Sequence, residues 1–336
     1  MKRLLFIIFI AIFSVFFSAT PLFAGQVLGV HILHPAEMEE AATLIKNEYN
    51  QDDWSYVTMT LSLEDLAKKD EWQKAFDQAK NYKIKPIVRL VTRFDSEKNA
   101  WAVPTRAEIV SYFSFLNSLT WPTENKLLIA FNEVNHASEW GGSLNPGQYA
   151  GILSFVADWA HTENNHYLIL PAAMDLAANN SGNTREAFAY LNQMLEGEPD
   201  VFSKIDFWNS HSYPNPAFSS APQKTGQNSL SGFAYELDWL KEKTGRELKV
   251  FITETGWEEN SKTKNKLYNY YSYAAEKIWT DERIVAVTPF VLKGDPGPFS
   301  KFTLIKGDNQ TTIQYTAVQN AIKIMTKSSQ IEVATF

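Results

Sequence analysis

Two glutamates stand where an apolar run of the sequence gives way to a loop. Glu133 follows Asn132, and Glu254 opens the stretch Glu254-Thr255-Gly256-Trp257. A carboxyl group is costly to hold in an apolar setting, so two that are delivered in the same way by separate strands indicate a paired-carboxylate site. The best-known chemistry of such pairs is cleavage of a glycosidic bond, in which both carboxyl groups take part.

Short runs rich in Val, Ile, Leu and Phe provide the strands that would carry these glutamates. Their length and composition favour strands over helices. The predicted strands are residues 26–33, 54–61, 86–91, 127–131, 167–171, 205–210, 250–253 and 284–291.

Between these runs the apolar spacing becomes that of a helix face. Trp72, Ala75, Phe76 and Ala79 fall at i, i+3, i+4 and i+7, and three further sets repeat the pattern: Tyr112, Phe115, Leu116 and Leu119; Ile152, Phe155, Val156 and Trp159; Val318, Ala321, Ile322 and Met325. Eight strand-then-helix units without an internal linker predict an α/β fold, a single-domain (β/α)8 TIM barrel over residues 25–326. Active sites of this fold lie at the C-terminal ends of the strands, so Glu133 on strand four and Glu254 on strand seven should point into one mouth.

Composition narrows the class of protein and of ligand. The chain has 336 residues, of which 45% are hydrophobic and 21% charged, as in ordinary folded proteins. The net charge of -7 offers no basic patch for nucleic acid, and a neutral carbohydrate is the better partner. There is no cysteine, so neither disulfides nor thiolate chemistry contribute. No cofactor is implied.

The first 24 residues have the order of an export signal. Lys2 and Arg3 precede an apolar run over residues 4–17, and small residues lead to Ala24. This order predicts a signal peptide cut after Ala24 and a secreted or periplasmic protein. An uncleaved membrane anchor is the alternative, because residues 4–24 are about long enough to span a bilayer. At the other end, residues 327–336 are predicted to form a C-terminal tail.

The two glutamate motifs resemble those of the clan A glycoside hydrolases, the 4/7 superfamily, and the resemblance covers residues 26–325. In that clan an Asn-Glu pair ends strand four and a second Glu ends strand seven, as Asn132-Glu133 and Glu254 do here. The resemblance implies a retaining glycoside hydrolase with Glu254 as nucleophile, Glu133 as acid/base and carboxyl groups about 5 to 5.5 Å apart. It also implies that Asn132 donates a hydrogen bond to the 2-hydroxyl of the sugar.

The sixth predicted strand leads into His211 and Tyr213, and several clan members carry a similar His-x-Tyr. The resemblance implies that Tyr213 orients Glu254 and that His211 contacts the sugar or Glu133. The alternative is that both side chains simply pack in the barrel mouth.

Two positions depart from the clan. Its usual arginine ends strand two, whereas Arg89 lies on the third predicted strand, so either the count of strands or the role of Arg89 differs. A guanidinium there could hold the nucleophile ionised. On strand eight, Phe290 stands where the clan usually places a tryptophan beneath the sugar, and we expect it to serve as a weaker platform.

Three tryptophans fall on predicted loops of the mouth, where rings can stack on sugars. Trp257 belongs to the strand-seven motif and is the strongest candidate. Trp101 and Trp140 follow strands three and four, and either could instead pack under its loop.

Two other classes of function compete. His31 and His34 suggest a metal-dependent hydrolase, but residues three apart in an extended segment point to opposite faces, and the later strand ends offer no adequate set of ligands. No metal is therefore predicted, although His31 could still line the sugar pocket. The departures at Arg89 and Phe290 suggest a second alternative, a barrel on the cell surface that binds glycan without cleaving it. The presence of both glutamates argues against that alternative.

Overall fold

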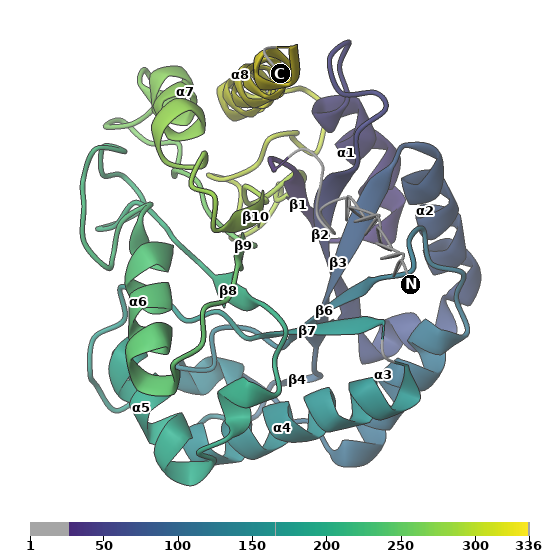
Figure 1. Ribbon diagram of the computed structural model, residues 1–336, viewed down its shortest axis with the longest axis vertical. Helices are drawn as coiled ribbons and strands as arrows, with labels where there is room; N and C mark the ends of the chain where they lie inside the picture. The colour runs from purple at the N-terminus through teal and green to yellow at the C-terminus, as the bar shows by residue number, and fades with distance from the viewer. Residues whose placement is uncertain (1–26, 165, 335–336) are drawn as a thin grey trace, which may run out of the picture.

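The computed structural model describes residues 27–164 and 166–334. The signal peptide or anchor predicted for residues 1–24 lies outside the described residues. Figure 1 shows a ring of strands with helices packed around its outside. Within the described ranges, no helix is both long and apolar enough to cross a bilayer.

Eight parallel strands form the ring in two sheets. The first sheet has the order β1-β2-β3-β6-β7 and the second has the order β10-β9-β8. The strands are β1 (Val30–Ile32), β2 (Ser55–Ser62), β3 (Ile84–Val91), β6 (Lys126–Ala130), β7 (Tyr167–Pro171), β8 (Trp208–Ser210), β9 (Val250–Ile252) and β10 (Ile284–Val287).

Backbone hydrogen bonds outside the named strands join the two sheets into a closed ring. On one side the amide of Gly29 donates to the carbonyl of Val287 at 2.8 Å. On the other, the amide of Asp206, just before β8, donates to the carbonyl of Ile169 in β7 at 2.9 Å. The prediction of a (β/α)8 barrel is therefore confirmed, with β6 as its fourth strand and β9 as its seventh.

In the described part of the chain, eight helices cover the ring: α1 (Met38–Ile45), α2 (Lys69–Asn81), α3 (Arg106–Asn117), α4 (Pro146–Glu163), α5 (Ala187–Gly197), α6 (Gly232–Thr244), α7 (Leu267–Lys277) and α8 (Ile313–Ala334). Local sequence explains several ends. Thr105 and Glu108 cap each other's backbone amides at the start of α3, and Gly245, with φ 72°, ends α6 in the left-handed conformation.

The predicted helix faces are largely correct. Trp72, Ala75, Phe76 and Ala79 of α2 are buried, as are the four predicted residues of α8. Leu119 is buried but lies after the end of α3. The segment 327–334, which we expected to form a tail, continues α8.

The barrel interior is filled by its own cluster of side chains, which includes Tyr56, Ile87, Ile129 and Phe251. A much larger apolar cluster lies between the strands and the helices. Because side chains fill the interior, a ligand can bind only at the mouth of the barrel, where loops and short elements follow the strands. At the mouth these elements are the hairpin β4 (Phe94–Asp95) and β5 (Ala100–Trp101) and the 3-10 helices η1 (Pro35–Glu37), η2 (Leu63–Ala67) and η3 (Ala137–Glu139), whereas η4 (Val201–Ser203) lies at the opposite end of the barrel, between α5 and β8.

Candidate active site

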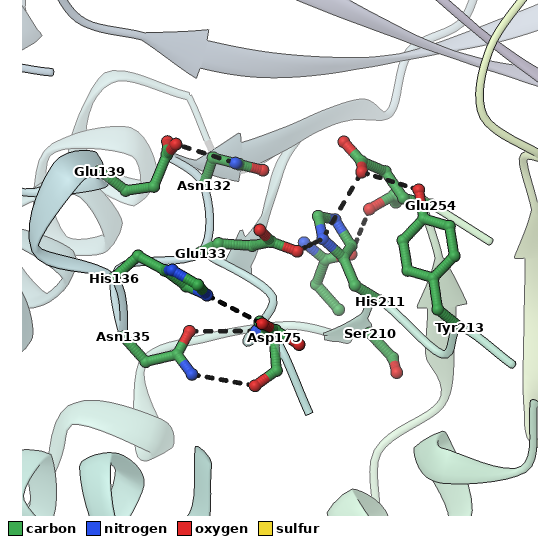
Figure 2. Close-up of polar contacts among 12 residues, drawn as sticks. Asn132, Glu133, Asn135, His136, Glu139, Asp175, Ser210, His211, Tyr213 and Glu254 are labelled. Atoms are coloured by element: carbon green, nitrogen blue, oxygen red, sulfur yellow. Dashed lines mark hydrogen bonds and ion pairs between the residues drawn. The ribbon is translucent and has the colours of Figure 1, made fainter. Parts of the chain in front are cut away.

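Glu133 and Glu254 lie at the C-terminal ends of β6 and β9, and Figure 2 shows both side chains converging on His211. The backbone after β6 is unusual, because Phe131 has φ 75° and Glu133 has φ 29°. Side-chain-bearing residues rarely adopt positive φ, and such strain persists only where surrounding contacts hold it.

Asn135 supplies such contacts. Its side-chain amide donates to the carbonyls of Asp175 and Arg185 at 3.0 Å each, and its oxygen accepts from the amide of Asp175, also at 3.0 Å. The imidazole of His136 bonds the carboxylate of the same aspartate at 2.9 Å. The loop that carries Glu133 is thus tied to the loop after β7 (Figure 2).

Glu254 is surrounded by donors. It is 8% exposed, Nη1 of Arg89 donates to its Oε1, and the hydroxyl of Tyr213 donates to its Oε2 at 3.2 Å. Burial raises the pKa of Glu254, but the charges of His211 and Arg89, with His31, outweigh it and lower the pKa to about 2. Glu254 is therefore an ionised carboxylate at any pH near neutrality.

Arg89 lies on β3, the third barrel strand, so the predicted strand count is correct and the departure from the clan pattern is real. Its Nη1 reaches both Oε1 of Glu254 and Oδ1 of Asn132, the latter at 2.7 Å. The guanidinium therefore places its positive charge against Glu254, as we considered, and it also links the two glutamate motifs.

Glu133 pairs with His211, whose Nδ1 lies 2.8 Å from Oε1 of that glutamate and 3.8 Å from Oε2 of Glu254. Burial alone would lower the pKa of His211, but the carboxylates of Glu254 and Glu133 overcome it and raise the pKa. One carboxylate oxygen of Glu133 and one of Glu254 lie within 4.8 Å of each other. The histidine is the common neighbour of both acids.

His31 is fully buried beside Glu254. Its Nδ1 lies 3.2 Å from the carbonyl of Thr253, and burial, with the nearby Arg89, lowers its pKa to about 3. The ring is therefore neutral and donates from Nδ1 to that carbonyl. His34 lies instead in an outer groove with Glu37 and Lys293, so the two histidines do not converge on a metal site.

Glu133, His211 and Glu254 do offer three ligand atoms within 4.8 Å of one another. Nδ1 of His211 already bonds Oε1 of Glu133, and Arg89 places a fixed positive charge against Glu254. A cation would meet that charge, so the donor set fits acid–base chemistry better than a metal.

A side cleft of about 240 Å³ opens next to the carboxylate pair, on the side of β2, β3 and β6. Its polar lining includes Arg89, Asn132 and Glu139, and its aromatic lining includes Trp101 and Phe299. Phe299 is 40% exposed, and Trp101 packs edge-on against the exposed Phe94. These two rings are the ones available to stack on a sugar.

Two of the predicted stacking residues require correction. Trp140 and Trp257 are both 0% exposed, and their indole N–H groups donate to Gln148 Oε1 at 3.0 Å and to the carbonyl of Ser220 at 2.8 Å. Each ring packs under its loop and shapes the mouth from beneath.

Phe290 lies in the mouth but is nearly covered. Its ring meets His31 edge-on at 5.1 Å and Phe299 at 5.0 Å, and it belongs to a cluster with Tyr213 and Val291. The exposed aromatic surface that we expected from Phe290 is supplied by Phe299, nine positions later in the chain. No spacing signal marked Phe299 or Glu139, because both are placed by loop geometry.

Comparisons with known proteins agree with this geometry. Residues 91–315 match the family described as glycosyl hydrolase catalytic core. A search of curated proteins found no match.

Solved structures share the fold at low sequence identity. The GH39 enzyme from Xanthomonas axonopodis pv. citri has a TM-score of 0.61 and 12% identity over 88% of this chain and 67% of its own. A GH128 endo-beta-1,3-glucanase from Sorangium cellulosum has a TM-score of 0.52 and 13% identity over 88% and 97%. The endo-1,4-beta-mannanase from Rhizomucor miehei has a TM-score of 0.54 and 12% identity over 90% and 95%.

The family match spans more than half of the chain and contains both glutamates, which favours an enzyme over the non-catalytic glycan-binding alternative. The chain belongs to the glycosyl hydrolase catalytic core family and is a glycoside hydrolase, and it shares its TIM-barrel fold with these solved structures.

Proposed function

We propose that the protein is an exported enzyme that cleaves O-glycosidic bonds of a poly- or oligosaccharide with retention of configuration. Glu254 is the nucleophile and Glu133 the acid/base. The observation that carries the proposal is the approach of their carboxylate oxygens within 4.8 Å. Retaining enzymes hold the two groups about 5 to 5.5 Å apart, whereas inverting enzymes need about 6.5 to 9.5 Å to admit a water between the general base and the sugar.

In the first step Glu254 attacks the anomeric carbon while Glu133 gives its proton to the departing glycosidic oxygen. The ionised state of Glu254, held by Arg89 and Tyr213, makes it the nucleophile without any prior proton transfer. The product of this step is a covalent ester between Glu254 and the sugar, and the aglycone leaves as an alcohol.

In the second step Glu133 accepts a proton from water, and the resulting hydroxide displaces Glu254 from the sugar. Esterification of Glu254 removes one of the two carboxylates that raise the pKa of His211. The Nδ1 of His211 lies 2.8 Å from Oε1 of Glu133, the carboxylate that takes the proton of the attacking water. Cleavage of the ester restores the charge on Glu254 and resets the pair.

Sugar binding is assigned to the side cleft. Asn132 faces the reacting ring, and its amide donates a hydrogen bond to the 2-hydroxyl. This hydrogen bond strengthens as positive charge develops at the anomeric carbon. Trp101 and Phe299 offer apolar ring faces for an adjacent sugar of the chain.

Export is proposed from the order of the N-terminal residues, in which Lys2 and Arg3 precede the apolar run and Ala24 ends a small-residue stretch. Sequencing the N-terminus of protein recovered outside the cytoplasm should give Gly25 as the first residue. Recovery of the enzyme in the membrane fraction with Met1 or Lys2 at its N-terminus would instead support the anchor.

Stereochemistry and azide rescue together test the mechanism. A panel of aryl glycosides first identifies a substrate, and NMR of the first-formed sugar should show the anomer of the substrate. With azide, Glu254→Gly should yield a glycosyl azide of inverted configuration, whereas Glu133→Ala should yield one of retained configuration. Formation of the opposite anomer by the native enzyme, or exchange of the two azide products, would contradict the assignment.

A further inference from the structure

Glu139 carries a carboxyl group in the cleft that takes no part in the proposed bond cleavage. It ends the 3-10 helix η3, six residues after Glu133, and it lines the side cleft together with Asn132 and Arg89. Its Oε2 accepts a hydrogen bond from Nδ2 of Asn132 at 3.3 Å, and Figure 2 shows the two side chains side by side.

The side-chain amide of Asn132 is therefore held at both ends. Nη1 of Arg89 donates to its Oδ1 at 2.7 Å, and Glu139 accepts from its Nδ2. A guanidinium can only donate and a carboxylate can only accept, so these two partners fix which end of the amide carries the oxygen. The second hydrogen of Nδ2 is left for a ligand in the cleft.

The strength of the contact between Glu139 and Asn132 depends on whether the carboxyl of Glu139 is ionised. Burial raises the pKa of Glu139 to about 7, with a further contribution from the charge of Glu133, while Asn132 and Arg89 oppose the rise. The more distant Glu254 acts in the same direction as Glu133. Close to neutrality the carboxyl therefore has a sizeable ionised fraction, in which its bond to the amide is strongest.

We propose that Glu139 is a positioning residue, which orients the amide of Asn132 so that its free N–H meets the 2-hydroxyl of the reacting sugar. This inference rests on the proposed function of Asn132. Glu139 itself makes no bond to the reacting atoms, and its effect is transmitted through the amide.

Four variants test the proposal: Glu139→Ala, Glu139→Gln, Asn132→Ala and the double variant. Loss of a hydrogen bond to a charged partner predicts a fall in kcat/KM of about tenfold for Glu139→Ala. The glutamine retains an acceptor and should recover most of that loss. Ser138→Ala, at the exposed neighbouring position of η3, is the matched control for disturbance of the short helix and should leave kcat/KM unchanged.

The double variant and a 2-deoxy substrate separate positioning from other roles. In the Asn132→Ala background, Glu139→Ala should cause no further loss. On a 2-deoxyglycoside, which lacks the hydroxyl that Asn132 meets, Glu139→Ala should match the native enzyme. Glu139→Met, which keeps most of the volume, replaces the alanine variant if that variant fails to fold.

Either an additive loss in the double variant or an equal loss on the 2-deoxy substrate would overturn the proposal. Failure of the proposed function gives a different result, because the native enzyme would then hydrolyse no glycoside, or Asn132→Ala would hydrolyse the 2-hydroxy substrate as fast as the native enzyme.

Discussion

The buried carboxyl of Glu236 should make the stability of the enzyme depend on pH, and Glu236→Gln should remove that dependence. Glu236 lies on α6 with no exposed surface, and it accepts a hydrogen bond from Ser210 at the end of β8. Burial raises its pKa to about 7, against the hydrogen bond from Ser210 that lowers it.

The direction in which stability changes with pH follows from the number of protons bound in the folded and the unfolded state. The unfolded carboxyl titrates at 4.5 and the folded one at about 7. Between these values the native state holds the proton and the unfolded state has lost it, so stability falls as pH rises through this window and is flat above it. A difference of roughly 2.5 units corresponds to about 3 kcal/mol lost between pH 4 and pH 8.

Glutamine has nearly the same shape and no charge at either pH. Relative to the native enzyme, Glu236→Gln should therefore gain about 3 kcal/mol more at pH 8 than at pH 4. Urea unfolding followed by tryptophan fluorescence at both pH values measures this difference. Glu37 and Glu139 also have a raised pKa, but both are present in the two proteins, so their contributions to the difference in stability cancel.

Glu247→Gln is the matched control, because this glutamate is fully exposed, and its change in stability should show no such pH dependence. Equal changes for Glu236→Gln at pH 4 and pH 8 would refute the reasoning, since the carboxyl would then have the same pKa in the folded and the unfolded state.

Three further predictions concern the mouth of the barrel. Arg89→Met should lower kcat and move the acidic limb of the pH profile of kcat/KM to higher pH, because the guanidinium helps to keep Glu254 ionised; an unmoved limb would contradict this. Trp101→Ala should raise KM for oligosaccharides by about tenfold and leave an aryl monosaccharide unaffected, as loss of a stacking ring predicts. Trp257→Phe should reduce stability by about 1 to 3 kcal/mol in thermal unfolding while KM stays constant, because the indole is buried.

Much of the fold was predictable because its strands are short apolar runs separated by helix-spaced segments. Glu133 and Glu254 could be placed because they directly follow β6 and β9, and a parallel barrel brings all strand ends to one mouth. The position of Arg89 was also readable from its strand, but its contact with Glu254 crosses the barrel and depends on side-chain reach.

Loop rings were harder to predict for a physical reason. The sequence shows that Trp140 and Trp257 follow strands, but whether an indole faces the cleft or packs beneath its loop depends on the turn of the backbone. Here Gln148 and the carbonyl of Ser220 satisfy the two indole N–H groups from within the fold. Phe299 and Glu139 show the converse, since both reach the cleft from loops without any periodic signal.

The two catalytic carboxyls are chemically alike, and their surroundings make them different. Arg89 and Tyr213 both donate to Glu254, whereas Glu133 has His211 as its near partner and a side chain that is 25% exposed. A carboxylate held by several fixed donors stays ionised, while one with a single titratable partner can exchange its proton. These environments support the proposed assignment of Glu254 as nucleophile and Glu133 as acid/base. Removing Arg89 should therefore raise the pKa of Glu254. Removing Tyr213 takes away one neutral donor and should raise that pKa less.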